Sequence, residues 1–368
     1  VFAYESEIDG PSGLQPVARR HFASDENGAL IGLTGPRVDV QLPEEIATKM
    51  DDFGLKPAEL TPSTLPDAVA PSADGFVTEP GSVEAGASTA FYATTKVIDN
   101  ADRWAGHPVG WGEGGKLPVK PYTFVTNFFN AYYDGKEREL KLGALGALGD
   151  GQVEGFNGTP LGWSIPVEDM SLDGAQSRDI VAHEAGHASL GGVKPGLGYG
   201  MSMALNEAVA DTTACLTAFD DPDVVARVLE ETGGDLRRPS EATRIAETIG
   251  EAKHRHGDED PSNDDHRFIR DMHSPLTLDD LELDRDSPMV PGMGISPSRD
   301  PHLVGEVISG GLYDLFASMY EQGVAAGKTP EQAIADAKEV TGTLTFRATR
   351  HIGEHMITFR DYALALLQ

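Results

Sequence analysis

The sequence predicts an α+β protein that is long enough for two lobes or two domains. Its 368 residues are 39% apolar, which suits a globular chain with an ample core. The main strand signal is TFVTNFFNAYY at 123–133, an alternating run rich in aromatic and β-branched residues. The helix signal is apolar spacing of three and four residues, which recurs in most segments from 178 onward. The C-terminal half is therefore predicted to be nearly all helical.

Residues 1–75 carry weaker signals. Residues 1–55 mix short apolar runs such as VDVQL with Gly and Pro, which predicts scattered strands. Residues 56–75 are rich in Pro, Ala and Ser and are predicted to be a linker. We therefore divide the chain into an N-terminal segment at 1–75 and a main domain at 76–368.

The main domain is predicted to begin with a helix from about residue 86, followed by the strand at 123–133. Asp134-Gly135 then signals a turn, and residues 143–163 form a Gly-rich loop. Helices are expected at 178–190, ending at Gly191-Gly192, at 203–219, at 222–253 with a Gly-Gly break, at 305–327, at 329–344 and at 357–367. Thr329 is the expected N-cap before Pro330.

Composition excludes several classes of protein. The net charge of −30 argues against a nucleic-acid partner and indicates a soluble surface, with bound calcium or basic substrates as alternatives. No run approaches 18 apolar residues, so no membrane-spanning helix is predicted. The single cysteine, Cys215, is expected to be a buried inert thiol.

The segment HEAGH at 183–187 is the main chemical signal. On a helix, His183 and His187 share one face and can direct two imidazoles at one metal ion. Glu184 lies on the adjoining edge, within reach of a water molecule at that ion. The alternative is a pair of surface or structural histidines, but the apolar surroundings IVAHEAGHASL predict burial, and buried polar groups need partners.

A second helical segment, NEAVAD at 206–211, offers a third ligand. A catalytic zinc takes three protein ligands and keeps one open position. Glu207 stands on the helix expected next after the one that carries His187, and an antiparallel arrangement of the two helices would bring it to the same ion. Asp211, one turn later, is placed to accept the spare N–H of a ligand histidine.

HEAGH followed by NEAVAD resembles the gluzincin metallopeptidases, in particular the thermolysin-like and fungalysin-like groups. Further resemblance lies in NAYY at 130–133, RDMHSP at 270–275, DPHLVGEVISGGLYDL at 300–315 and the terminal ITFRDYALALLQ. It covers roughly residues 86–368 and leaves 1–75 outside. It implies a two-lobed zincin fold, with a mixed lobe at about 76–200, carrying an edge strand and the active-site helix, and a mainly helical lobe at 201–368.

The resemblance also implies roles for individual residues. His183, His187 and Glu207 would bind Zn²⁺, and Glu184 would act as general base. His302 and Tyr199 would stabilise the oxyanion. The residues expected to support the ligands or His302 are Asn206, Asp211 and Asp300. The residues expected to contact substrate are Asn130, Ala131, Arg270, Ile180 and Ile269, the two isoleucines favouring an apolar residue after the cleaved bond.

The sequence departs from the family pattern at some positions. Tyr199 is one residue short of the thermolysin-like spacing, and Pro297 stands where that group has an aspartate that orients the second histidine. Calcium is a second candidate ion, because Asp179 matches a calcium-binding position and the acidic run at 258–265 lies near His254, His256 and His266. That run is more simply interpreted as a solvated loop.

The resulting hypothesis is a zinc endopeptidase, expected to be a secreted monomer that acts on peptides or proteins and does not engage nucleic acid or membrane. A zinc aminopeptidase, or a peptidase-like binding protein that has lost activity, is the alternative. A third hypothesis is a non-enzymatic helical scaffold whose histidines are structural.

The chain contains a mirrored motif, HIGEH, at 351–355. An inverted zinc site would also need a third ligand well downstream, but the stretch from 356 to 368 contains neither histidine nor glutamate, and its one acid is Asp361. We therefore expect His351 and His355 to be ordinary helix histidines and Glu354 a surface acid.

Overall fold

The computed structural model describes residues 2–8, 14–20, 33–41, 83–111, 115–126, 131–145, 174–197, 201–247, 268–277, 301–352 and 359–368. These residues combine helices and strands, so the predicted α+β class is confirmed. The chain divides into two compact units, each built from separate stretches of sequence. The helices α1 (Val83–Ala105) and α2 (Arg178–Val193) contribute residues to both units.

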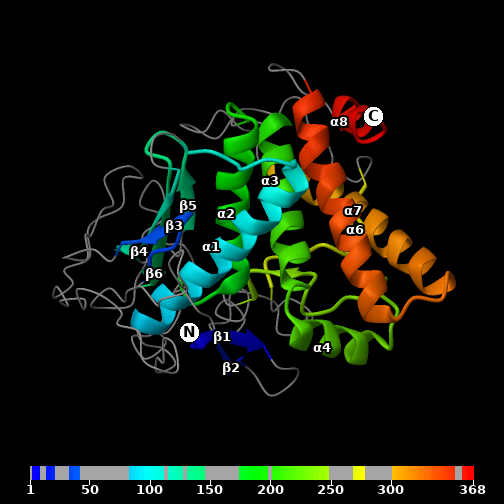
Figure 1. The fold of residues 1–368 in the computed structure, drawn as a ribbon, viewed down its shortest axis with the longest axis horizontal. Helices are drawn as coiled ribbons and strands as arrows, with labels where there is room; N and C mark the ends of the chain where they lie inside the picture. Colours follow the sequence, from blue (N-terminus) through cyan, green and yellow to red (C-terminus); the bar gives the residue numbers. More distant parts are fainter. Residues whose placement is uncertain are drawn as a thin grey trace, which may run out of the picture. The chain divides into compact units, whose positions relative to one another are not determined.

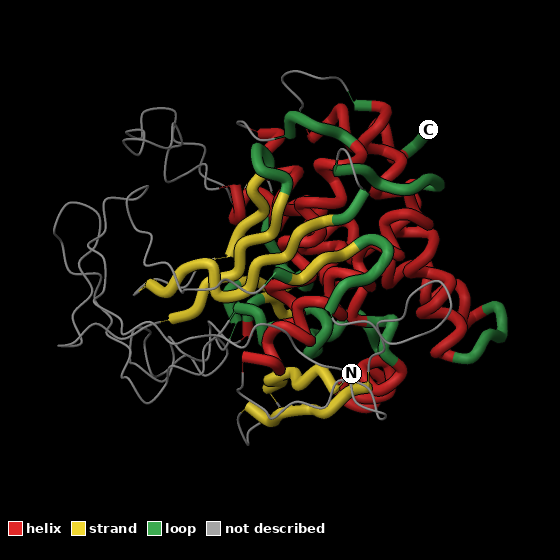
Figure 2. The backbone as a smooth tube through the Cα atoms, turned by 60° about the vertical axis from the view of Figure 1, so that its left-hand side comes forward, coloured by secondary structure: helices red, strands yellow, loops and turns green. Residues whose placement is uncertain are grey.

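The first unit contains a mixed four-stranded sheet, whose strands are yellow in Figure 2. Its order is β3 (Val38–Val40), β4 (Leu117–Thr126), β6 (Glu139–Leu145) and β5 (Ala131–Asp134). Strand β4 runs parallel to β3 and β6, whereas β5 pairs antiparallel with β6 and lies at one edge of the sheet. A separate antiparallel pair consists of β1 (Phe2–Ile8) and β2 (Leu14–Arg20). Strands therefore occur within 1–55, as predicted.

The single strand predicted at 123–133 is wrong, because the structure has two strands there. Strand β4 ends at Thr126 and β5 begins at Ala131. The two run in opposite directions along their common neighbour β6, which one continuous strand could not do. The turn predicted at Asp134-Gly135 is confirmed, and the Asp134 carboxylate accepts hydrogen bonds from the backbone N–H groups of Lys136 and Glu137, both at 3.0 Å.

The Gly-rich stretch at 143–163 is only partly described. Residues 143–145 belong to strand β6 and not to a loop, because they complete its pairing with β4. Residues 146–163, like the predicted linker at 56–75, lie outside the described part of the chain.

The second unit is mainly helical. Its elements are α3 (Met201–Ala218), α4 (Pro222–Thr232), α6 (Pro301–Ala325), α7 (Pro330–His351), α8 (Phe359–Leu366) and the short antiparallel pair of β7 (Arg244–Ile245) and β8 (Arg270–Asp271). Helix α6 packs against both α3 and α7, and α8 packs against α7 (Figure 1). Cys215 on α3 is buried, as predicted. Among the described helices, none has the length and apolar character that crossing a membrane requires.

The ends of these helices follow local capping chemistry. Thr329 caps α7 through a capping box with Gln332, so the predicted N-cap is confirmed. Helix α4 ends at Gly233, whose φ of 66° is left-handed and places its N–H near the last carbonyls. The helix predicted over 222–253 is therefore wrong for residues 233–246, which form turns and strand β7, whereas residue 247 is helical and 248–253 lie outside the described residues.

Helix α2 also differs from the prediction, since it continues through Gly191-Gly192 to Val193. A Cβ atom added to Gly192 would lie 3.0 Å from the backbone nitrogen of Gly110. Gly192 is thus required by close packing of two backbones and does not terminate the helix.

Candidate metal centre

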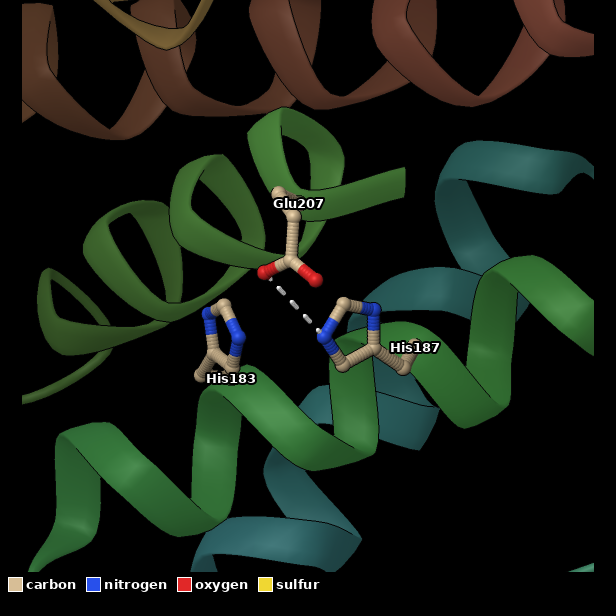
Figure 3. Close-up of side chains that lie close together, drawn as sticks. All are labelled: His183, His187 and Glu207. Carbon is tan, nitrogen blue, oxygen red and sulfur yellow. Dashed lines mark ion pairs between the residues drawn. The ribbon is translucent and has the colours of Figure 1, made fainter. Parts of the chain in front are cut away.

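Three potential metal ligands meet where α2 and α3 lie side by side. His183 and His187 project from the same side of α2, one turn apart, towards the carboxylate of Glu207 on α3 (Figure 3). One ligand atom from each residue lies within 4.8 Å of the other two. Nε2 of His187 and Oε2 of Glu207 lie 3.6 Å apart. The three residues predicted to share an ion are therefore brought together.

The geometry of this triad suits a zinc ion. Zinc binds nitrogen and oxygen donors at about 2.0–2.1 Å in a tetrahedron, which places neighbouring donors about 3.3 Å apart. The 3.6 Å pair is close to that spacing, and because all three ligand atoms lie within 4.8 Å of one another, the ion would draw them together by at most about 1.5 Å. Two imidazoles and one carboxylate also form a donor set that leaves one position open for chemistry. The residues present therefore fit the metal.

A glycine inside HEAGH explains why the third ligand reaches the first two. A Cβ atom added to Gly186 would lie 2.9 Å from the Cα atom of Ala210 and 3.2 Å from its carbonyl oxygen. Helix α3 can approach α2 this closely only because Gly186 has no side chain. Ala210 follows Glu207 by one turn, so the contact at Gly186 sets the position of the carboxylate.

The imidazole of His187 is oriented by Asn206. The Asn206 side-chain nitrogen donates to the carbonyl oxygen of Leu197 at 2.9 Å, which turns its amide oxygen towards Nδ1 of His187 at 3.0 Å. Because an amide oxygen only accepts hydrogen bonds, Nδ1 carries the proton and Nε2 keeps its lone pair for a metal. The structure thus places Asn206 against His187, and its predicted role in supporting a metal ligand stays a prediction.

Glu184 is hydrogen-bonded to the edge strand of the sheet. Its Oε2 accepts from the backbone N–H of Tyr133 on β5 at 3.1 Å. This N–H points away from β6, towards the unpaired side of β5. Alternate residues of a strand direct their backbone groups to the same side, so Ala131 also faces the free edge. A peptide added along that edge would therefore lie next to the Glu184 carboxylate.

His302 lies beside the triad from the start of α6. Its Nε2 is 3.4 Å from Oε2 of Glu207, and its side chain is 47% exposed. Helix α6 comes this close because Gly305 has no side chain: an added Cβ atom would lie 3.1 Å from both the Ala204 carbonyl oxygen and the Glu207 Cβ. His302 is thus placed to reach a group bound next to Glu207.

Asp211 and Arg270 form a buried ion pair. The Arg270 Nε and Nη2 groups donate to the two carboxylate oxygens of Asp211, both at 2.8 Å, and the Asp211 side chain is 1% exposed. Burial disfavours the Arg270 cation, but Asp211 outweighs this and keeps its pKa above the ordinary value. The roles predicted for these two residues, towards a ligand histidine and towards substrate, remain predictions.

The other predicted positions are divided between described and undescribed parts of the chain. Ile180 is buried and Ile269 is half-buried. The Asp179 carboxylate accepts hydrogen bonds from the backbone N–H groups of Ile180 and Ala246 and from the Ser177 hydroxyl, so its contacts organise the start of α2. Asn130, Tyr199, Asp300, the acidic run at 258–265 and His254, His256 and His266 lie outside the described residues.

The mirrored motif HIGEH does not join the candidate centre. His351 is the exposed last residue of α7, while Glu354 and His355 lie outside the described residues. Among the described side chains, one cluster of three or more possible metal ligands is found, and it consists of His183, His187 and Glu207.

No protein-family model and no curated protein matches the chain. A solved structure that matches is the precursor of protealysin, a metalloproteinase from Serratia proteamaculans, with 15% identity and a TM-score of 0.47. The match covers 91% of this chain and 81% of that chain. A likeness of this size does not identify a family, so the functional assignment rests on the side chains of the site.

Sequence reasoning missed several residues that shape the site. These are Tyr133, Gly186 and Gly305. A visible signal existed for the two glycines, since both stand inside quoted motifs, among the small residues that allow helices to pack closely. The backbone contact of Tyr133 has no sequence signal, because it depends on how an edge strand meets a helix.

Proposed function

We propose that this protein is a zinc-dependent endopeptidase. The observation that carries the proposal is the convergence of His183, His187 and Glu207 within 4.8 Å, with Glu184 next to them in the same motif. Two histidines and a glutamate with one open position form a donor set used for hydrolysis by zinc.

The chemistry assigns separate tasks to the metal and to Glu184. A zinc ion held by the triad supplies Lewis acidity, which polarises a peptide carbonyl and makes a water molecule more acidic. Glu184 takes a proton from the attacking water and passes it to the leaving amine nitrogen. Its hydrogen bond to Tyr133 N–H holds the carboxylate towards the strand edge on which the peptide would lie.

We propose that the substrate binds as an added strand along β5. Asn130 and the backbone of Ala131 would align it, because an edge strand offers unpaired N–H and C=O groups. Arg270 would donate to a substrate carbonyl, and Ile180 with Ile269 would favour an apolar residue after the scissile bond. His302 and Tyr199 would donate to the oxyanion.

The partners and setting of the enzyme belong to the same proposal. We expect a peptide or protein substrate, a monomeric enzyme and a location outside the cell. The net charge of −30 supports the expectation that nucleic acid is not a partner.

The test compares zinc-loaded wild type with Glu184→Gln on a library of N-acetylated peptides. We expect about one zinc per chain in both proteins and a kcat lower by roughly 10²–10⁴ in the variant, because the base is lost while the ligands remain. Glu321→Gln, an exposed substitution on α6, is the matched control.

Two outcomes would contradict the proposal. Equal hydrolysis by wild type and Glu184→Gln would remove Glu184 from the mechanism. Cleavage of peptides only when their N-terminus is free would assign the chain to the aminopeptidases instead.

A further inference from the structure

The carboxylate of Glu207 is approached by imidazole groups from two different helices. Nε2 of His187 on α2 lies 3.6 Å from its Oε2 atom, and Nε2 of His302 on α6 lies 3.4 Å from the same oxygen. His187 belongs to the cluster of three residues whose ligand atoms lie within 4.8 Å of one another, and His302 is not one of the three. His302 therefore lies against the third ligand without belonging to the ligand cluster.

One carboxylate oxygen can serve a metal ion and His302 together. Each carboxylate oxygen has two lone pairs, so one lone pair can bind the ion while the other accepts an N–H group. A neutral imidazole with its proton on Nε2 is a sufficient donor, so the contact does not require a charged histidine. The Glu207 side chain is 8% exposed, so water competes little for the second lone pair.

The packing of α6 against α3 holds His302 next to Glu207. A Cβ atom added to Gly305 would lie 3.1 Å from the Glu207 Cβ and 3.3 Å from the backbone nitrogen of Ala208. His302 precedes Gly305 by three residues, so both lie on the same side of the first turn of α6. The positive end of the α6 dipole is at this turn and favours an ionised carboxylate beside it. The start of α6 thus supports the charge and the position of Glu207.

We propose that His302 is a positioning residue for the metal ligand Glu207, so that α6 helps to set the affinity of the protein for zinc. In the enzyme without substrate, the Nε2–H group of His302 holds Oε2 of Glu207 in the orientation that the ion needs. During the proposed hydrolysis, the same group turns to the oxyanion, a movement that the 47% exposure of its side chain permits. This inference rests on the proposed function, since it takes zinc as the bound metal.

The test measures the zinc dissociation constant of the full chain by competition with a chelator, which does not depend on turnover. In His302→Ala, we expect Kd to rise about tenfold, because groups that support metal ligands contribute roughly 10–100-fold to metal affinity. In His302→Gln, the side-chain amide N–H can replace Nε2–H, so Kd should stay within about threefold of the wild-type value. Because glutamine is not among the usual zinc ligands, this rescue also separates positioning from direct coordination.

Two further variants test whether the effect belongs to this contact. Leu303→Ala shortens the next side chain on α6, which is apolar and 40% exposed, and should leave the zinc Kd unchanged. Gly305→Ala forces α6 away from Glu207, so it should weaken zinc binding as His302→Ala does. Urea unfolding of the metal-free proteins should give the wild-type midpoint for His302→Ala, because the side chain is exposed. A lowered midpoint would assign the loss of zinc to folding and overturn the positioning role.

The outcomes separate this inference from the function on which it rests. Equal zinc Kd values in wild type and His302→Ala would overturn the role of His302 alone. Equal weakening in His302→Ala and His302→Gln would also overturn it, because the N–H donor would then be irrelevant. A wild type whose zinc affinity depends on His302 but which cleaves no peptide would overturn the peptidase proposal alone. A wild type that binds no zinc would overturn both.

Discussion

Helices α2 and α7 both carry a histidine from a motif with the letters of a zinc site, but their surroundings differ. His183 on α2 is 6% exposed and lies within reach of His187 and Glu207. His351 is the exposed last residue of α7, just before the cap at Ile352. Metal ligands therefore need more than the right spacing. They need a neighbouring helix that delivers the remaining donor.

The surroundings of the two motifs also differ in how far polar side chains are buried. Around HEAGH, the carboxylate residues Glu184, Glu207 and Asp211 are all buried. Burying a carboxylate costs several kcal/mol unless hydrogen bonds, ion pairs or a metal compensate. Buried carboxylates are therefore stable only where such compensation exists. Here the backbone N–H of Tyr133 compensates Glu184, and the guanidinium of Arg270 compensates Asp211. At the end of α7, water solvates His351 and no compensation is needed.

The largest expected effect comes from replacing a histidine of HEAGH, and the same replacement in HIGEH is its control. His187→Ala should lose most bound zinc and all measurable peptidase activity, because two remaining donors hold zinc weakly. His351→Ala should keep about one zinc per chain and full activity. Elemental analysis after dialysis against a low zinc concentration, followed by a peptide assay, measures both. Loss of zinc in His351→Ala would contradict the conclusion that the histidines of α2, and not His351 on α7, bind the metal.

A smaller effect is expected at the glycine that brings α3 to α2. In Gly186→Ala, the added Cβ would lie 2.9 Å from Ala210 Cα, so the helices must separate. We expect a loss of about 1–3 kcal/mol in unfolding free energy and weaker zinc binding, because Glu207 moves with α3. The measurements are urea unfolding and zinc titration.

Gly311 provides the matched control for that substitution. It lies in α6 with no atom within 4 Å of an added Cβ. Gly311→Ala should be neutral or stabilise by up to about 1 kcal/mol, because alanine favours the helix. Equal destabilisation by the two substitutions would show that the α2–α3 contact is not specific.

The smallest expected effect concerns the acids of α6. The folded pKa of Glu306, about 7, lies above its ordinary value of 4.5, so the folded state binds the proton more tightly. Stability from this group is fully present below pH 4.5 and is lost as pH rises through 7. Glu306→Gln should therefore match wild type at low pH and exceed it by about 1–2 kcal/mol above pH 7, after allowance for partial exposure.

Glu321 is an exposed acid on the same helix as Glu306, so its substitution is the control for the effect of burial. It is half exposed and pairs with Arg237 at the surface. Glu321→Gln should change the unfolding free energy by less than about 0.5 kcal/mol at any pH. Chemical unfolding at several pH values checks both variants. A pH-independent effect of Glu306→Gln would contradict the assigned titration.

Much of the helical part could be predicted because its signals are local. Periodic apolar residues predicted the helices that carry HEAGH and NEAVAD, and Thr329-Pro330 predicted the start of α7. Errors occurred where a local signal had a tertiary cause. Gly192 was interpreted as a helix end although it accommodates the backbone of Gly110. The strand break after Thr126 follows from pairing with β6, which no local pattern reveals.

The sequence by itself determined the chemical identity of the site. The i, i+4 spacing of His183 and His187 places both imidazoles on one helix face, and local helix geometry alone dictates this. Only the tertiary structure decided which other groups complete it. Gly186 and Gly305 let α3 and α6 approach closely enough for Glu207 and His302 to reach the centre, and β5 presents the backbone of Tyr133 to Glu184. Distances between separate elements depend on packing of the whole chain, which spacing along one helix does not contain.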